Sequence, residues 1–179
     1  YYTASLATKL KKYYRKGIIT SVLRRVDEVL SPQVDRAEEY IRDAFDELYY
    51  FAQHISEGKG ESAEEINLRV TDEVRDQEGW EEIDKKFSIL RIKLKELHEE
   101  IKSFVEVLID YETETDMARI TMEFRGIANK LNFSADVIHS FLDSGDDGYV
   151  RWIEGRVGRG GVLSGLGLSP LDISSNLKE

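Results

Sequence analysis

Positively charged side chains gather at the two ends of the chain, and their chemistry suits contact with a polyanion. The first 26 residues contain seven Lys and Arg and no Asp or Glu. Guanidinium and ammonium groups bind phosphate oxygens, and an indole ring can stack on a nucleic-acid base. The candidate contact residues are Lys9, Lys11, Lys12, Arg15, Lys16, Arg24, Arg25, Arg151, Trp152, Arg156 and Arg159. Trp152 has a second interpretation, because an aromatic residue within a strand often packs into a core.

The charge between these ends has the opposite sign. The net charge is −10, and residues 27–148 hold 32 Asp and Glu against 14 Lys and Arg. An acidic middle between basic ends predicts that both ends lie near a polyanion and that the middle points away from it. The alternative is an ordinary solvated surface with one basic helix.

No other group of residues builds a convincing catalytic or metal site. The glycines of 155–160 are not followed by the helix that a dinucleotide loop needs, and 58–60 lacks the rest of a Walker A motif. His54, His98 and His139 do not stand in zinc-ligand spacing and are predicted to be ordinary surface or hydrogen-bonded histidines. We therefore expect no catalytic residues, no metal and no ATPase activity in this chain alone.

The absence of cysteine and of a long apolar run restricts the chemistry and the cellular environment expected for this chain. The sequence has no cysteine, which excludes disulfides, thiolate zinc sites and iron–sulfur ligation within these residues. This composition suits a reducing cytoplasm. No run of about 20 apolar residues is present, so a membrane is not an expected partner.

Three long helices are expected at 32–57, 79–111 and 115–142. Ser31 and Pro32 are typical of a helix start, with Ser as N-cap and Pro at the first position. The short connection after 111 makes the second and third helices antiparallel. Because apolar residues also lie off its main stripe, the second helix is predicted to be central.

Each expected helix carries apolar residues at alternating spacings of three and four, as in a packed seam. These positions are predicted to be core. The seams are Val34, Ala37, Ile41, Ala44, Leu48, Phe51 and Ile55; Ile83, Phe87, Leu90, Leu94, Leu97, Ile101, Phe104, Leu108 and Tyr111; and Met117, Ile120, Phe124, Ile127, Leu131, Ser134, Ile138 and Phe141.

Three short segments have strand character. Ile66, Leu68 and Val70 alternate with polar residues, and the apolar stretches 149–154 and 162–168 flank a Gly-rich turn at 155–161. We expect residues 65–70, 149–154 and 162–168 to form one small sheet. The predicted fold is mainly α: three long antiparallel helices with a β-hairpin near the C-terminus.

The closing segment "YVRWIEGRVGRGGVLSGLGLSPLDIS" resembles the return from the helical insertion to the motor core in DinG-type, XPD-like DNA helicases of superfamily 2. Members have a Tyr-Val-x-Trp-[Ile/Val]-Glu strand, a variable Gly/Arg turn and a strand ending in Pro-Leu-Asp-[Val/Ile]. The matching residues are Tyr149, Val150, Trp152, Ile153, Glu154, Pro170, Leu171, Asp172 and Ile173. The stretches 15–30 and 66–83 also resemble the family in order, with less specific motifs.

The resemblance implies an Arch insertion between helicase motifs II and III of a longer polypeptide. Residues 1–31 would be a basic helical root joining the first motor domain, 32–148 the Arch, and 149–179 the returning hairpin. It implies an ATP-dependent 5′–3′ DNA helicase acting in DNA repair, whose Arch guides or gates single-stranded DNA beside the motor domains. ATP and Mg would be bound elsewhere in that polypeptide, and the resemblance does not decide whether an iron–sulfur cluster is present.

Two other classes of function remain open. A protein-interaction module would present an exposed apolar stripe on the first or third helix. A structural coiled-coil protein would have no reason to carry the strand–turn–strand ending.

Overall fold

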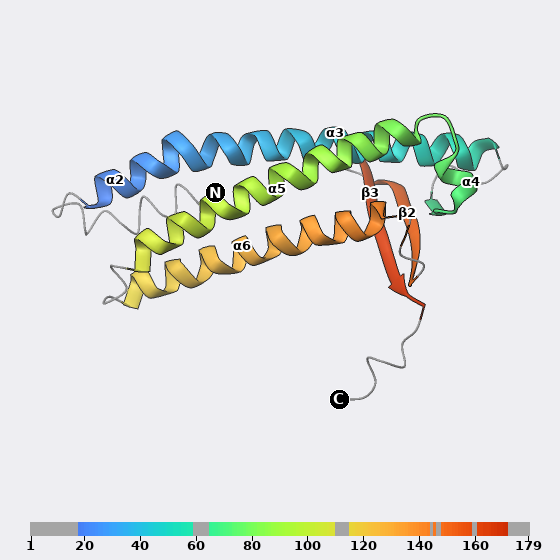
Figure 1. Cartoon of the computed structure of the whole chain (residues 1–179). Coiled ribbons are helices and arrows are strands. Elements are labelled where there is room, and N and C mark those ends of the chain that lie inside the picture. The colour runs from blue at the N-terminus through green and yellow to red at the C-terminus, as the bar shows by residue number, and fades with distance from the viewer. Residues whose placement is uncertain are drawn as a thin grey trace. The chain divides into compact units, whose positions relative to one another are not determined.

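Long helices make up most of a computed structural model of the chain, which describes residues 18–58, 65–109, 115–143, 145, 148–158 and 161–171 (Figure 1). The predicted class, mainly helical with a small antiparallel sheet near the C-terminus, is confirmed. The elements are α2 (Ile18–Arg25), the π-helix η2 (Val26–Leu30), α3 (Ser31–Gly58), β1 (Glu65–Arg69), α4 (Asp72–Arg75), α5 (Trp80–Ile109), α6 (Thr115–Leu142), β2 (Tyr149–Gly158) and β3 (Gly161–Pro170).

The prediction that a helix starts at Ser31 is wrong, because α2, η2 and α3 follow one another without a break. Ser31 has helical backbone angles (φ −59°, ψ −47°), and its N–H donates to the carbonyl of Val26. Pro32 has no N–H, and its ring would crowd the preceding turn of a regular α-helix. The wider π turn just before Pro32 lets the helix continue, and it buries Val26 and Leu30.

The described residues divide into two compact units, of which the first comprises those within 18–39 and 94–131. Its core lies between the α2–η2 segment, the C-terminal half of α5 and the N-terminal half of α6. Phe104 is fully buried, and its ring meets that of Phe124 edge to face at 5.1 Å between centroids. The other buried members are Val22, Val26, Leu30, Ala37, Leu97, Ile101, Val105, Leu108, Ile120 and Ala128.

The second unit comprises the described residues within 40–93 and from 132 onward, and it contains the sheet. Phe87 of α5 is fully buried and meets the ring of Phe45 of α3 at 5.2 Å. At the surface of the same pair of helices, Lys86 Nζ bonds Glu47 at 2.9 Å and Asp43 at 3.1 Å. The hydrogen bond to Glu47 is the main cause that raises the pKa of Lys86.

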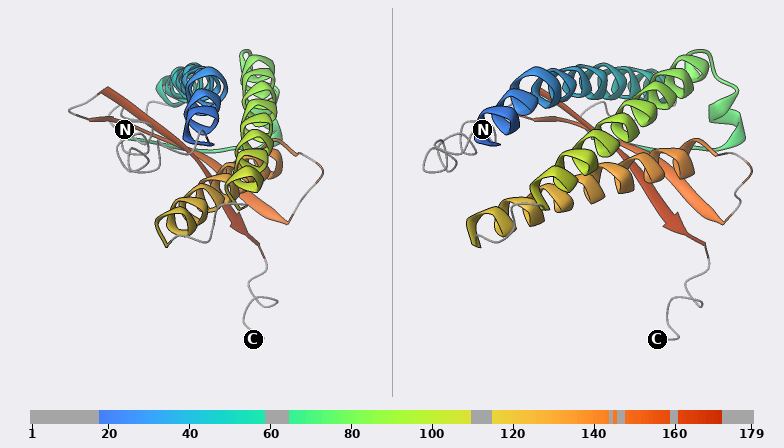
Figure 2. Two further views of the ribbon diagram at one scale, coloured as in Figure 1. Left: turned by 90° about the vertical axis from the view of Figure 1, so that its left-hand side faces the viewer. Right: turned by 60° about the vertical axis from the view of Figure 1, so that its left-hand side comes forward.

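The three strands form one antiparallel sheet in the order β1-β2-β3. Figure 2 shows β2 and β3 as two long ribbons side by side. The predicted segments 65–70, 149–154 and 162–168 lie in or next to these strands. The predicted turn at 155–161 is too long, since β2 continues to Gly158, which pairs with Gly161. Gly161 has a φ of +116°, a conformation that favours glycine at the start of the returning strand.

Burial alternates along β1 and β2, so the sheet has an inner and an outer face. On the inner face, Ile66, Leu68 and Ile153 are buried, and Ser164 Oγ donates to the carbonyl of Phe45 at 2.7 Å. The outer face consists of Glu65, Asn67, Arg69, Trp152, Glu154 and Arg156, with Leu163, Gly165 and Gly167 as their partners on β3.

The predicted seams are confirmed along α5 and only in part elsewhere. Every described seam residue of α5 is buried. Val34 and Ile41 of α3 are 38% and 39% exposed, and Ser134 of α6 is exposed, while Ala135 beside it is buried. Regular spacing identifies an apolar stripe, but burial also requires a neighbouring element over each part of it.

Gly155 provides a test of how closely the sheet approaches α3. A Cβ at this position would lie 3.0 Å from Tyr49 Cδ2, whereas a Cβ at Gly165 would meet nothing within 4 Å. Gly155→Val should therefore lower the free energy of unfolding by about 1–3 kcal/mol through overpacking. Gly165→Val is the matched control and should leave it nearly unchanged. Urea unfolding curves measure both, and equal effects would contradict the close approach to Tyr49.

Candidate nucleic-acid interface

Only some of the predicted contact residues are described and exposed. Lys9, Lys11, Lys12, Arg15, Lys16 and Arg159 lie outside the described residues. The Arg24 side chain is 69% exposed, and its Nε lies 3.9 Å from a carboxylate oxygen of Glu28 one turn further along. Such an exposed ion pair is weak, so Arg24 is available to an anion.

Arg25 is already engaged, in contrast to Arg24. Its Nη2 donates to Glu100 Oε1 at 2.7 Å and to Ser103 Oγ at 3.0 Å, and its Nε donates to the same carboxylate at 3.1 Å. These bonds join α2 to α5. Reversing the charge of Arg25 would place two carboxylates against each other, so such a variant would alter the fold as well as any contact with DNA.

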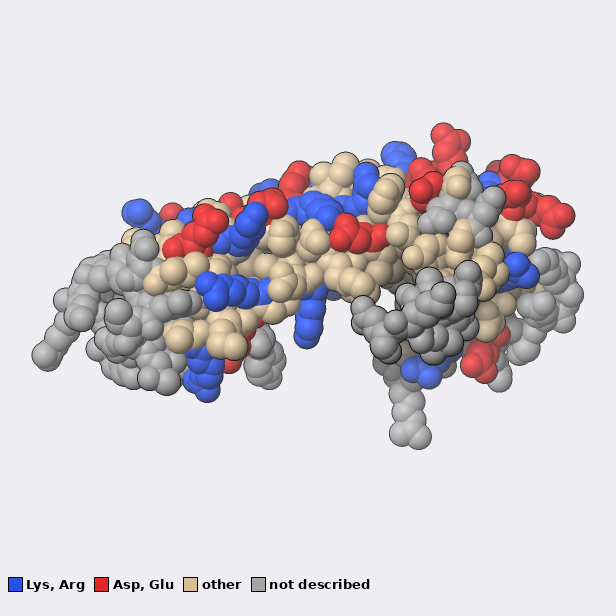
Figure 3. Space-filling model, turned by 60° about the horizontal axis from the view of Figure 1, so that its bottom comes forward, with Lys and Arg blue, Asp and Glu red and all other residues tan. Residues whose placement is uncertain are grey.

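The end of α2 borders a cleft of about 570 Å³ with mixed charge. Arg24 and Arg25 line it together with Glu28 and Glu100, beside the apolar Phe104. The first 26 residues contain no Asp or Glu, yet the carboxylates of Glu28 and Glu100 lie next to Arg24 and Arg25. On the face in Figure 3, Lys and Arg side chains are likewise interspersed with Asp and Glu over the described residues.

Arg151 is 7% exposed and serves the fold. Its Nε donates to the carbonyl of Ser140 at 2.9 Å, and its Nη1 donates to the carbonyl of Tyr149 at 3.2 Å. The guanidinium is thus turned to the end of α6, and its Nη2 has no partner in the described part of the chain. A buried side chain used in this way is not placed to contact a phosphate.

Arg75 completes this arrangement at the last turn of α6. It donates to the carbonyls of Leu142 and Phe141 at 2.9 and 3.0 Å, and its guanidinium lies 5.0 Å from the centre of the Trp80 ring. Burial, followed by the nearby charge of Arg151, lowers the pKa of Arg75. Two cations therefore satisfy carbonyls that a helix C-terminus leaves unpaired, where they also complement its dipole.

Trp152 lies on the outer face of the sheet and not in the core. It is half-buried, and it pairs with Gly167 of β3. A Cβ added to Gly167 would meet Cε2 of the indole first, followed by Nε1 and Cδ2, the two ring atoms bonded to it. That order indicates an approach through the flat face of the ring, so the indole covers Gly167. The indole N–H donates to Glu154, which fixes the ring's orientation.

Arg156 is the exposed cation of β2, and β1 adds two polar residues that the sequence reasoning did not propose. Arg69 stands opposite Trp152, and Asn67 stands opposite Glu154. Alternation with Ile66 and Leu68 placed these two side chains on the polar face of β1. Their proximity to Trp152 depends on the β1–β2 register, for which the sequence gives no signal.

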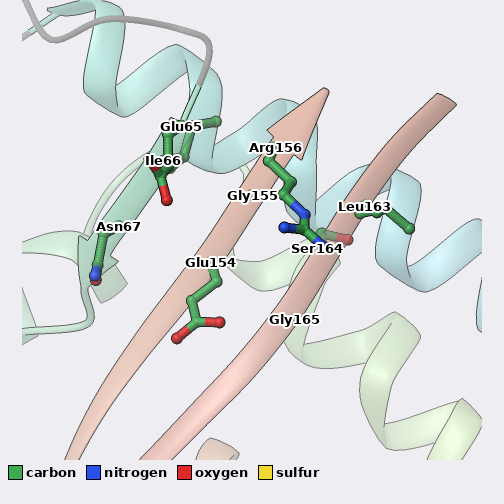
Figure 4. Close-up of a pocket in the computed structure, with 9 residues that line it drawn as sticks. All are labelled: Glu65, Ile66, Asn67, Glu154, Gly155, Arg156, Leu163, Ser164 and Gly165. Carbon is green, nitrogen blue, oxygen red and sulfur yellow. The ribbon is translucent and has the colours of Figure 1, made fainter. Parts of the chain in front are cut away.

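A cleft of about 770 Å³ lies along this part of the sheet. Figure 4 shows Glu154 and Arg156 extending from the middle strand, between Asn67 of β1 and Leu163 of β3. Gly165 of β3 is also part of the lining, and it adds no side chain to the cleft.

The described residues contain no group of three or more His, Asp or Glu that could hold a metal ion. His98 Nδ1 lies 2.9 Å from the carbonyl of Ala128, as expected of a hydrogen-bonded histidine. None of the described helices has the length and apolar character needed to cross a membrane.

Comparison of the chain with protein-family models, with curated proteins and with solved structures finds no match. Any assignment of function therefore rests on the residues and geometry described above.

Proposed function

We propose that the chain is an Arch-type accessory domain of a DinG-type, ATP-dependent 5′–3′ DNA helicase, in which it guides or gates single-stranded DNA beside the motor domains. ATP and Mg would bind to the motor domains, and this chain would only contact the single-stranded DNA. A role in DNA repair follows from the same resemblance.

The hairpin is the observation that carries this proposal. The two halves of the segment that resembles DinG-type helicases are β2 and β3, which pair along their whole length. Tyr149 stands opposite Pro170, and the N–H of Leu171 donates to the carbonyl of Gly148 at 2.8 Å. The beginning of the motif thus lies beside Pro170 and Leu171, whereas Asp172 and Ile173 lie outside the described residues. This pairing supports a segment that closes an insertion and returns to a core.

Binding of single-stranded DNA to the chain tests the proposed function directly. In the variant Lys12→Glu with Arg24→Glu, two cations of the basic root are reversed. We expect about tenfold weaker binding at low salt, and a log–log salt slope that is shallower by about 0.7 for each phosphate that the variant no longer neutralises. Fluorescence anisotropy of a labelled oligothymidine at several salt concentrations measures both quantities.

The matched control reverses two exposed arginines of α3, Arg36→Glu with Arg42→Glu. It changes the net charge by the same amount and should leave affinity and slope nearly unchanged. If both double variants lose affinity equally, only the overall charge matters, and the basic root has no specific role. If the unaltered chain binds no single-stranded DNA at low salt, the proposed function is wrong.

A protein-docking module is the second candidate, because large apolar residues are exposed. Met122 and Phe133 of α6 are each 69% exposed. Exposed apolar residues mark a surface that another protein covers when they belong to a contiguous patch. A stable dimer of the chain in solution that Phe133→Asp abolishes would favour this candidate over DNA guidance.

A further inference from the structure

We infer that the outer face of the sheet is a stacking platform for single-stranded DNA, with one base on the indole of Trp152. The inference rests on the proposed function and adds how the strand is held. It concerns only β1, β2 and β3, which belong to the second unit.

The first reason for a stacking platform is the position of the Trp152 ring on the sheet. One flat face of the indole covers Gly167, and the bond to Glu154 holds the ring in that orientation. Within the described residues, no aromatic ring or cation packs on Trp152. A fixed, flat ring favours stacking of a base, because a side chain that is already ordered loses little entropy when the base binds.

The residues next to Trp152 can bind the other parts of a nucleotide, its phosphate and its base edge. Arg69, opposite Trp152, and Arg156, four residues further along β2, are both exposed and have no ion-pair partner in the described part of the chain. Either guanidinium can bind a phosphate next to the stacked base. Asn67 lies on β1 opposite Glu154, and its side chain offers both a donor and an acceptor to a base edge.

The shape of the surface also suits a flexible strand. On β3, Gly165 adds no side chain to this face between Leu163 and the indole that covers Gly167, and the cleft of about 770 Å³ follows Trp152 on the same face. That volume falls within the range of about 300–1,000 Å³ that is usual for small-ligand clefts.

The charges of the platform predict a particular kind of binding. Glu65 and Glu154 balance Arg69 and Arg156, so the face has no net charge to attract phosphates. Retention must therefore come mainly from stacking, and binding should depend on the presence of bases more than on salt. This separates the platform from the basic root, whose contribution is electrostatic.

The experiment compares two fluorescein-labelled strands of equal length and charge, an oligothymidine and an abasic deoxyribose-phosphate oligomer. The unaltered chain should bind the oligothymidine about tenfold more tightly. Trp152→Leu should remove this preference, and Trp152→Phe should retain most of it. Tyr50→Leu, at an aromatic residue of α3 that is 61% exposed, is the control and should keep it.

A second variant tests the platform without removing the indole. Gly167→Ala places a methyl group where the ring lies and should displace it, so the preference should fall as in Trp152→Leu. Equal binding of both strands by the unaltered chain overturns the platform while the proposed function stands. A preference that survives in both Trp152→Leu and Gly167→Ala also overturns it. Failure of both strands to bind at low salt overturns the proposed function itself.

Discussion

Phe104→Asp is expected to abolish the cooperative unfolding transition of the first unit. Phe104 has no exposed surface, and it packs against Phe124 within the cluster that joins α2, α5 and α6. An aspartate there would bury a carboxylate without a partner, which costs several kcal/mol. Because a typical domain has a net stability of only about 5–15 kcal/mol, the packed state should be lost or severely weakened.

Circular dichroism during thermal and urea unfolding measures this effect. Met122→Asp is the matched control, since it introduces the same group at a side chain that is 69% exposed. It should shift the free energy of unfolding by no more than about 0.5 kcal/mol. A Phe104→Asp variant that unfolds like the unaltered chain would show that the core of the first unit is assigned incorrectly.

Arg151→Met should destabilise the second unit, although the sequence alone predicts Arg151 as a DNA contact. The substitution removes the donors for the carbonyls of Ser140 and Tyr149, in a place that water reaches poorly. A fully buried acceptor without a partner costs about 1–3 kcal/mol, and because these two carbonyls are only partly buried, we expect a total loss within that range. Removal of the unpaired Nη2 offsets part of this cost.

Arg156→Met makes the same chemical change five residues further along β2, on the exposed outer face. It should change the free energy of unfolding by no more than about 0.5 kcal/mol. Urea unfolding of both variants, followed by far-ultraviolet circular dichroism, distinguishes the roles of the two arginines. Equal stabilities would mean that the guanidinium of Arg151 does not hold the end of α6.

The basic root and the outer face of the sheet would hold single-stranded DNA in different ways. In the proposed function the root would bind DNA through its charge, so its contribution would fall as salt screens the phosphates. The outer face of the sheet is locally neutral and would depend on the indole of Trp152. Measuring salt dependence and base dependence in the same set of variants therefore separates the two contributions.

The sequence by itself predicted the elements of this fold and much of its core. The spacing of apolar residues located α5 and α6, and all described seam residues of α5 are buried. Alternation in β1 and the small apolar segments after 148 identified the three strands. These features are local, because the hydrophobic periods of helices and strands are written in neighbouring residues.

Only the tertiary structure determined the role of each charged or aromatic side chain. Arg24 and Arg25 are adjacent in sequence, but only Arg25 faces Glu100, which lies on another helix. Arg151 and Arg156 share a strand, yet one holds the end of α6 and the other is exposed. Arg69 gained its place beside Trp152 through strand register. The sequence could not reveal these roles because each depends on a partner that is distant along the chain and is brought close only by folding.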